Sequence, residues 1–498
     1  MKPSPGEGQR VVGAIGWSSV GTIANFAALS IALPITARLI EPAVFGAVAF
    51  AMSIVATVTS VTITIITQAV IEPDEIDQRH MRATLTASLC LGLPLAAAVF
   101  AAGPLTEDLL HFDGSSTALR YVSAIVLIRS VGRVPRSGLY RQLRFRTLTA
   151  SQTVSYFVGG LIVPVAMATA GYGVEALALG YLVQELIDLV WCWRSAHWLR
   201  PAGLGSIGAA GQVLRANSAM SAIGLTSVLS QQIDNFAIGA VLGADGLGQY
   251  SRVYRLSTLP ANLFTDAVGV VLFPAVARVR DQRDRLLRSM TGGFLAAAAG
   301  ALPLCLVAAV YSHEIVRLVL GPGWEQAASA MQFLAPAAAA RVLLKVAAAV
   351  HRGVALKQRL AWLSATYTTT IGLGALIGAQ FGLAEAALGV LIGVTVGAVL
   401  CWLSLGSAVP GLLRPLSYVT MVLVPTSVGV VGFAVASRSA FGGGLLAMAI
   451  SLLLGYALTI GVVAAGAERG WPPAAWVSAQ VRNVVNRRST PASPSPHR

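Results

Sequence analysis

Long apolar runs separated by short polar links dominate the sequence. Each run spans about 20 residues or more, the length that a helix needs to cross a bilayer. The runs are continuous and lack the alternation of barrel strands. The pattern therefore predicts an all-α polytopic membrane protein with about fourteen transmembrane helices. The expected spans are 11–36, 43–69, 83–105, 118–139, 147–169, 174–193, 214–242, 246–276, 290–311, 326–350, 360–380, 384–405, 415–436 and 442–465.

Composition supports this fold class and excludes several others. Hydrophobic residues make up 55% of the 498 residues, charged residues 11%, and the mean hydropathy is +0.72. So few polar side chains could not cover the surface of a soluble multidomain enzyme. The four cysteines lie in apolar runs without C-x-x-C spacing, so we expect buried, unpaired thiols. They are Cys90, Cys192, Cys305 and Cys401.

The net charge of +14 is distributed unevenly among the links between spans. In a soluble protein such a charge would favour nucleic-acid binding; here the positive-inside rule explains it without a nucleic-acid partner. Basic links alternate with acidic or neutral ones, and the acidic link 72–77 is the one exception. This distribution predicts that both termini are cytoplasmic. The basic links lie near 136–146, 278–288 and 341–359, and the opposite ones near 106–108, 170–173, 243–245 and 381–382.

Two sequence segments recur in the second half of the chain. Gly171-Tyr-Gly-Val-Glu-Ala-Leu-Ala-Leu-Gly180 matches Gln380-Phe-Gly-Leu-Ala-Glu-Ala-Ala-Leu-Gly389, and 38–46 loosely matches 240–248. Both matches fall at the same place in a six-helix unit. They predict two six-helix lobes related by a pseudo-twofold along the membrane normal, plus two extra helices. The expected domains are an N-lobe 1–200, a C-lobe 201–410, a helix pair 411–467, and a basic, Pro/Ser-rich cytoplasmic tail 468–498.

Motifs for catalysis or metal binding are missing from the sequence. The six histidines never pair at metal spacing, and no G-x-S-x-G, H-E-x-x-H or Walker pattern occurs. Gly203-Leu-Gly-Ser-Ile-Gly208 fits G-x-G-x-x-G but lies in a loop without a preceding strand, so it is a chance match. We expect no catalytic residue, no metal and no cofactor, and hence not an enzyme.

The informative residues are charged side chains inside apolar spans, because each is costly unless it faces a cavity or a partner. Several arginines share a helix face with one another or with tyrosines. The candidate cavity residues are Arg129, Arg133, Tyr250, Arg252, Tyr254 and Arg255. The alternative is that the arginines extend to lipid headgroups, which applies most to Arg133. A cationic, Tyr-lined cavity suits an anionic, sugar-bearing ligand, since arginine forks bind phosphate. This chemistry predicts a phosphate-linked glycolipid cargo.

Asp234 and Asn235 add polar groups to the span 214–242. Asp234 and Arg255 each lie about nine residues from the short turn that joins their spans, so both are roughly 13–14 Å deep. Antiparallel helices joined by so short a turn are neighbours. We therefore expect Asp234 to pair with Arg255, or with Arg252, when the cavity is empty. The pair could be a proton-coupled switch or a static device that lowers the cost of burying Arg255.

Several of these segments together resemble a known family. Gly138-Leu-Tyr-Arg-Gln-Leu-Arg-Phe-Arg-Thr-Leu, Ala170-Gly-Tyr-Gly-Val-Glu-Ala-Leu and Arg38-Leu-Ile-Glu-Pro-Ala-Val-Phe-Gly46 carry the likeness, with 234–260 and Leu272-Phe-Pro274. They resemble the polysaccharide-transport branch (Wzx-like oligosaccharide-lipid flippases) of the multidrug/oligosaccharidyl-lipid/polysaccharide (MOP) exporter superfamily. The likeness covers about residues 10–405.

The resemblance implies a function. Such a protein would flip undecaprenyl-diphosphate-linked oligosaccharide repeat units across the inner membrane by alternating access, for exopolysaccharide, capsule or O-antigen/lipopolysaccharide assembly. By analogy Arg129, Arg252 and Arg255 would hold the diphosphate or acidic sugars. Membrane lipids, a polysaccharide polymerase and chain-length machinery are the candidate partners. Two alternatives stay open: a multidrug/cation antiporter of the same superfamily, and a membrane-embedded polysaccharide polymerase.

Overall fold

A computed structural model shows the chain as an assembly of helices. It describes residues 27–28, 30–73, 75–110, 112, 114–199, 203–278, 282–353, 357–409 and 411–468, and these residues contain no β-strand. Within them, nine helices are long and apolar enough to cross a membrane. The predicted fold class, an all-α polytopic membrane protein, is confirmed.

The helix bounds follow the predicted spans closely. The helix Ser30–Leu39 covers the end of the first expected span, most of which lies outside the described residues. The first half of the chain then contains α2 (Pro42–Ile71), α3 (Gln78–Leu110), α4 (Ser115–Arg141), α5 (Phe145–Phe157), α6 (Val163–Thr169), α7 (Val174–Ser195) and α8 (Ile207–Arg278). The second half contains α9 (Arg283–Val310), α10 (Ser312–Val319), α11 (Glu325–Gly353), α12 (Lys357–Ala379), α13 (Leu383–Ala408), α14 (Leu413–Phe441) and α15 (Leu445–Glu468).

Two of the predicted spans are interrupted helices. A π-helical turn, Val158–Ile162, joins α5 to α6 within the expected span 147–169. The spans 214–242 and 246–276 are the two arms of α8, which meet at Gly243. Gly243 has φ 66° and ψ −162°, a backbone conformation that only glycine adopts without strain. The kink at this glycine is therefore the predicted short turn.

The contacts divide the chain into two compact units. Unit 1 comprises Met1–Arg252, Val316–Ala327 and Ala375–Ala386. Unit 2 comprises Val253–Ile315, Ala328–Gly374 and Ala387–Arg498. The lobe boundaries expected from the repeat stay a prediction.

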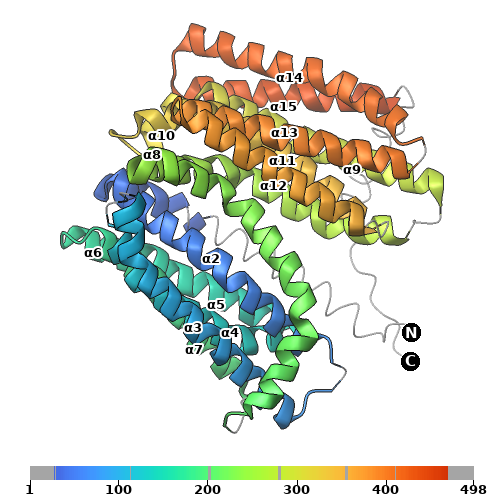
Figure 1. Ribbon diagram of the computed structural model, residues 1–498. Helices are drawn as coiled ribbons and strands as arrows, with labels where there is room; N and C mark the ends of the chain where they lie inside the picture. The colour runs from blue at the N-terminus through green and yellow to red at the C-terminus, as the bar shows by residue number, and fades with distance from the viewer. Residues whose placement is uncertain are drawn as a thin grey trace, which may run out of the picture. The chain divides into compact units, whose positions relative to one another are not determined.

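In unit 1, α4 is the central helix and packs against α2, α3 and α7 (Figure 1). Its core includes Ile66, Met81 and Leu139, all less than 3% exposed. The π-helical turn approaches α7 through two glycines. A Cβ on Gly159 would lie 2.5 Å from the carbonyl oxygen of Gly180, and a Cβ on Gly180 would lie 2.5 Å from that of Gly159.

The start of α2 packs closely against the start of the second arm of α8, within unit 1. The repeat aligns Gly46 of α2 with Gly248 of α8, and hence Pro42 with Ala244. A Cβ on Gly46 would lie 1.7 Å from the Ala244 carbonyl oxygen, and a Cβ on Gly248 would lie 1.8 Å from that of Pro42. The two contacts are reciprocal and bring the two helix backbones very close together.

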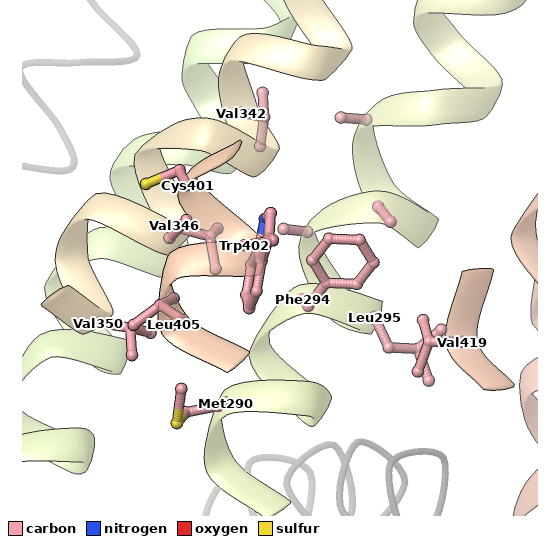
Figure 2. Packing of buried hydrophobic residues seen from close by; sticks show 14 of the residues in the cluster. Met290, Phe294, Leu295, Val342, Val346, Val350, Cys401, Trp402, Leu405 and Val419 are labelled. Atoms are coloured by element: carbon pink, nitrogen blue, oxygen red, sulfur yellow. The ribbon is translucent and has the colours of Figure 1, made fainter. Parts of the chain in front are cut away.

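In unit 2, a large apolar cluster joins α9, α11, α13 and α14 (Figure 2). Phe294 and Trp402 form its aromatic centre, with ring centroids 4.8 Å apart at 87°. The helices α14 and α15 pack against each other and against α9. The two helices that follow the expected second lobe are thus anchored through α9.

The prediction for the cysteines is wrong at one position. All four are unpaired, and Cys192, Cys305 and Cys401 are buried, but Cys90 is exposed. An apolar run gives no direct sign of which helix face points outward, because lipid-facing positions are as apolar as buried ones. Cys90 lies on such an outward face of α3.

Candidate functional site

Three arginines lie on one face of α4 in unit 1. Arg129, Arg133 and Arg136 follow one another at spacings of four and three residues, which places them on one side of a helix. This side lies against α2 and α7. Arg129 and Arg133 were both predicted as cavity residues, and Arg136 was expected in a cytoplasmic link.

Two carboxylates of α7 neutralise the outer two arginines of this row. Arg129 donates from Nε and Nη2 to Oε1 of Glu185, at 2.9 and 2.7 Å. Arg136 Nη1 lies 2.5 Å from Oδ2 of Asp188, whose Oδ1 accepts a hydrogen bond from Ser151. Pairing of this kind lowers the high cost of charges inside an apolar protein. Neither ion pair was predicted. Glu185 and Asp188 lie inside the predicted span 174–193, and two carboxylates in an apolar span are the sequence signal that could have indicated these pairs.

Arg133 is the exception in this row. Its Nε donates to the Thr67 hydroxyl of α2 at 2.8 Å. Among the described residues no carboxylate forms an ion pair with it. The side chain is half-buried. Arg133 is therefore a half-buried cation whose Nε is bound by a hydroxyl and not by a carboxylate.

A cavity of about 400 Å³ lies in unit 1 between α2, α4 and the first arm of α8. Its lining is mixed, with apolar patches from Ala56, Ile63 and Val228. Arg129 lines it, but neither Arg133 nor Arg252 belongs to the described lining. The polar groups of the lining are Thr59, Ser60, Thr64, Arg129, Ser227, Gln231 and Gln232.

Asp234 and Tyr250, from the two arms of α8, meet on either side of the kink. The Tyr250 hydroxyl donates to Oδ2 of Asp234 at 2.7 Å, and the tyrosine and the aspartate are 0% and 3% exposed, respectively. Asn235 donates from Nδ2 to Oε1 of Gln232 and to the Ser53 hydroxyl of α2. The structure thus brings together two predicted site residues, a tyrosine and a carboxylate, and ties a third to the cavity lining through Gln232.

Arg252 lies under an aromatic ring of α2. Its Cζ is 3.8 Å from the centroid of the Phe45 ring, a cation–π geometry, and the residue is 8% exposed. Phe45 is in turn packed on Trp324, whose indole Nε1 donates to the Ala37 carbonyl. In unit 1, Arg252 is therefore held in a cluster of large aromatic side chains.

Tyr254 and Arg255 belong to unit 2. Arg341 of α11 lies over the Tyr254 ring, with its Cζ 4.7 Å from the centroid. Arg255 is half-buried, and its backbone carbonyl accepts a hydrogen bond from Thr258. Because Asp234 is in unit 1, its pairing with Arg255 stays a prediction.

The described residues contain no group of three or more potential metal-ligating side chains. The site consists instead of arginines, paired carboxylates, hydroxyls and amides. Such a set can bind polar or anionic ligands, and it offers no evident nucleophile activated by a base.

Solved structures identify the fold. The lipid II flippase MurJ, in an inward closed conformation, has a TM-score of 0.74 at 11% identity, covering 89% of this chain and 97% of its own. An inward-facing multidrug-resistance MATE transporter of the MOP superfamily has a TM-score of 0.55 at 17% identity, covering 80% and 95%. The chain is a multi-pass helical membrane protein that shares the fold of these two transporters.

Sequence relatives identify the family. The family model for polysaccharide biosynthesis proteins matches residues 35–329, and the chain belongs to this family. It is similar to the succinoglycan biosynthesis transport protein ExoT of Rhizobium meliloti (25% identity, 54% of each chain) and to the lipopolysaccharide biosynthesis protein WzxC of Escherichia coli (21% identity, 66% of each).

These comparisons also bear on the predicted family and activity. The matches span about half to two thirds of the length of these relatives. The predicted resemblance to a polysaccharide family is confirmed by the family model, and the solved MATE and MurJ structures share the predicted fold. Those relatives and neighbours whose names state an activity are transporters or flippases, in agreement with the expectation that the chain is not an enzyme.

Proposed function

We propose that the chain is a flippase that translocates polyprenyl-diphosphate-linked oligosaccharide repeat units across the bacterial inner membrane by alternating access. The cargo would serve exopolysaccharide, capsule or O-antigen/lipopolysaccharide assembly. The observation that carries the proposal is the polar cavity beside the arginine row of α4, in a chain of the polysaccharide biosynthesis family. A lipid-linked oligosaccharide has a large polar headgroup that must cross the apolar core, and a polar cavity is what lowers that cost.

The charge of this site argues against the antiporter alternative. Among the described residues that line the cavity, Arg129 is the ionisable one. The nearby carboxylates Glu185 and Asp188 are both engaged by arginines. An organic cation would need a carboxylate that faces the cavity, whereas an anionic cargo needs arginine. The site chemistry therefore disfavours an organic cation as the cargo.

Arg133 is the residue best placed to hold the diphosphate. It has no carboxylate partner among the described residues and lies about one helical turn from the cavity-lining Arg129. Arg252 and Arg255, with Tyr254, are further candidate contacts for the diphosphate or for acidic sugars, whereas Tyr250 is buried with its hydroxyl on Asp234. Their roles rest on charge and on family membership.

Asp234 is proposed to couple transport to protons. Anionic cargo would compete with its carboxylate for Arg255, and protonation of Asp234 would release the arginine. The alternative is a static pair. Replacing Asp234 with Asn should abolish the pH dependence of transport if the pair is a switch, and should leave both transport and its pH dependence unchanged if the pair is static.

The expected topology completes the proposal. The positive-inside distribution supports an inner-membrane protein with both termini cytoplasmic. The lobes 1–200 and 201–410 would move so that the site opens first to one side of the membrane and then to the other. The helix pair 411–467 would shelter the lipid tail. A polysaccharide polymerase and chain-length machinery would receive the cargo on the far side.

Complementation of a deletion strain tests the proposal. Wild-type protein should restore polysaccharide export, and Arg133→Ala should not, because a truncated side chain cannot pair with a phosphate. Arg133→Lys should restore export only in part, since it retains the charge but loses the bidentate fork. Arg120→Ala is the matched control, because Arg120 is an exposed arginine of the same helix. Normal export by a folded Arg133→Ala variant would refute this assignment of Arg133, and unchanged export by the deletion strain would refute the function.

A further inference from the structure

A short segment from the second half of the sequence is built into unit 1. This segment, the strap, is Val316–Ala327, and it runs from α10 through Gly321-Pro322-Gly323 to the first turn of α11. The chain on both sides of the strap, up to Ile315 and from Ala328 onward, belongs to unit 2. A movement that carries the strap along with its neighbours in the chain must therefore break its contacts within unit 1.

Trp324 anchors the strap. Its side chain is 1% exposed, and its ring lies against that of Phe45 of α2, with the ring centroids 5.8 Å apart. Its indole Nε1 donates to the carbonyl of Ala37, in the helix Ser30–Leu39, at 3.1 Å. The ring is thus buried and its N–H group is satisfied, which is the arrangement that holds a tryptophan firmly. The strap is fixed in this way to α2 and to the helix that precedes it.

Two further hydrogen bonds hold the ends of the strap. Arg38 donates from Nη2 to the Leu318 carbonyl at 2.8 Å. The Ala327 backbone N–H donates to Oε1 of Gln249, in the second arm of α8, at 3.0 Å. Between these two ends, Gly321 turns the backbone with φ 92°, a conformation that favours glycine. All three hydrogen bonds lie outside the helical ladders, so they can break and re-form without the loss of a helix.

The expected topology places the strap on the outer side of the membrane. The basic link near 278–288 is expected to be cytoplasmic. The chain then crosses the membrane once, in the expected span 290–311, before it reaches the strap. The link that contains Ala37 and Arg38 follows one span after the N-terminus, which is also expected to be cytoplasmic. The strap and its partners are therefore expected on the same, outer side.

We infer that the strap is an outer latch. While Trp324 is seated, the outer end of unit 1 is closed, and its release opens the cavity between α2, α4 and the first arm of α8 to the outside. This inference rests on the proposed alternating access and names a contact that has to break during it. The populations of the seated and released states depend on their difference in free energy. Removing contacts that exist only in the seated state must therefore raise the share of outward-open molecules.

Thiol labelling measures that share without any need for transport. Gln231 is an exposed residue of the cavity lining, about 18 Å along the helix from the kink at Gly243, so a cysteine there reports access to the cavity. The full-length parent protein carries Gln231→Cys, and its exposed Cys90 is replaced with Ala. Intact cells that express it are treated with a membrane-impermeant maleimide, and the rate of labelling is measured.

Trp324→Ala should raise the rate of labelling from outside at least tenfold. Trp324→Phe keeps a buried ring but loses the N–H donor, so it should raise the rate about threefold. Trp362→Ala is the matched control and should leave the rate unchanged, because Trp362 is 77% exposed. Folded Trp324→Ala protein that is labelled no faster than its parent would overturn the inference. If Trp324→Ala does not fold, Trp324→Phe decides by the same comparison.

A cross-link tests the latch during transport. A Cβ on Gly321 would lie 3.4 Å from Cγ of Arg38, so cysteines at these two positions are within reach of a disulfide or a short bifunctional thiol reagent. In liposomes, cross-linked Arg38→Cys/Gly321→Cys should flip lipid-linked oligosaccharide at least tenfold more slowly than its parent, and reduction of the disulfide should restore the rate. Each single variant should stay within about twofold of the parent.

A cross-linked protein that flips at the parent's rate would overturn the inference. A parent protein that does not flip lipid-linked oligosaccharide would instead refute the proposed function. The labelling rates would still decide whether the strap closes the cavity, because they do not depend on the cargo.

Discussion

The crossing of α2 and α8 at Gly46 and Gly248 allows a quantitative test of the packing in unit 1. In Gly248→Ala the new Cβ would lie 1.8 Å from the Pro42 carbonyl oxygen, and Cβ atoms in proteins essentially never approach another atom within 3.0 Å. The obstacle is backbone, which cannot rotate away. The two helices therefore have to separate until that distance grows to at least 3.0 Å.

The energetic cost follows from this displacement. Overpacking a close contact costs about 1–3 kcal/mol. Replacing glycine with alanine in an open stretch of helix instead stabilises by up to about 1 kcal/mol. A Cβ on Gly211 of the same helix would meet no other atom within 4 Å, so Gly211→Ala is the matched control. We expect Gly248→Ala to lower thermal stability and Gly211→Ala to raise it or leave it unchanged.

The reciprocal geometry leads to a second expectation, which concerns the double variant of Gly46 and Gly248. Once Gly248→Ala has separated the helices, most of the space for a Cβ on Gly46 already exists. The double variant Gly46→Ala/Gly248→Ala should therefore cost clearly less than the sum of the two single variants. Thermal unfolding of purified protein in nanodiscs measures all four variants. Gly248→Ala as stable as wild type, or strictly additive losses, would refute the reciprocal crossing.

Three further predictions concern the polar groups. Tyr250→Phe should destabilise the protein by about 1–3 kcal/mol in thermal unfolding, because it leaves a buried aspartate without its hydroxyl donor; unchanged stability would contradict that bond. Glu185→Met should destabilise more than the double variant Arg129→Met/Glu185→Met, because only the single change leaves a charge unpaired; the opposite order of melting temperatures would exclude a paired arginine. In intact cells a membrane-impermeant thiol reagent should label a cysteine placed at Tyr172 but not one at Arg144, and reversed labelling would overturn the orientation.

Hydropathy alone was sufficient to predict most of the fold. The length of an apolar run is set by the bilayer, so the ends of α2, α7 and α13 follow directly from the sequence. The kink at Gly243 was predictable because the link Gly243-Ala244-Asp245 interrupts the pattern. The exposure of Cys90 was not, because a lipid-facing position and a buried one carry the same residue types.

The site was predictable in residue type but not in partnership. The cost of burying a charge marked Arg129 and Arg133 as important from the sequence alone. Which carboxylate neutralises which arginine depends on the packing of α4 against α7, and no spacing within one helix encodes that contact. The direction in which the hydroxyls of α2 donate depends likewise on rotamers that the sequence does not fix.

Flipping by purified protein in liposomes tests the central claim most directly. Lipid-linked oligosaccharide is placed in both leaflets, and a glycosidase added outside removes the glycan that it can reach. We expect that wild-type protein exposes the inner-leaflet pool to the enzyme, and that Arg133→Ala, reconstituted in equal amount, leaves that pool protected. An inner-leaflet pool that stays as protected with wild-type protein as in protein-free liposomes would contradict the flippase function.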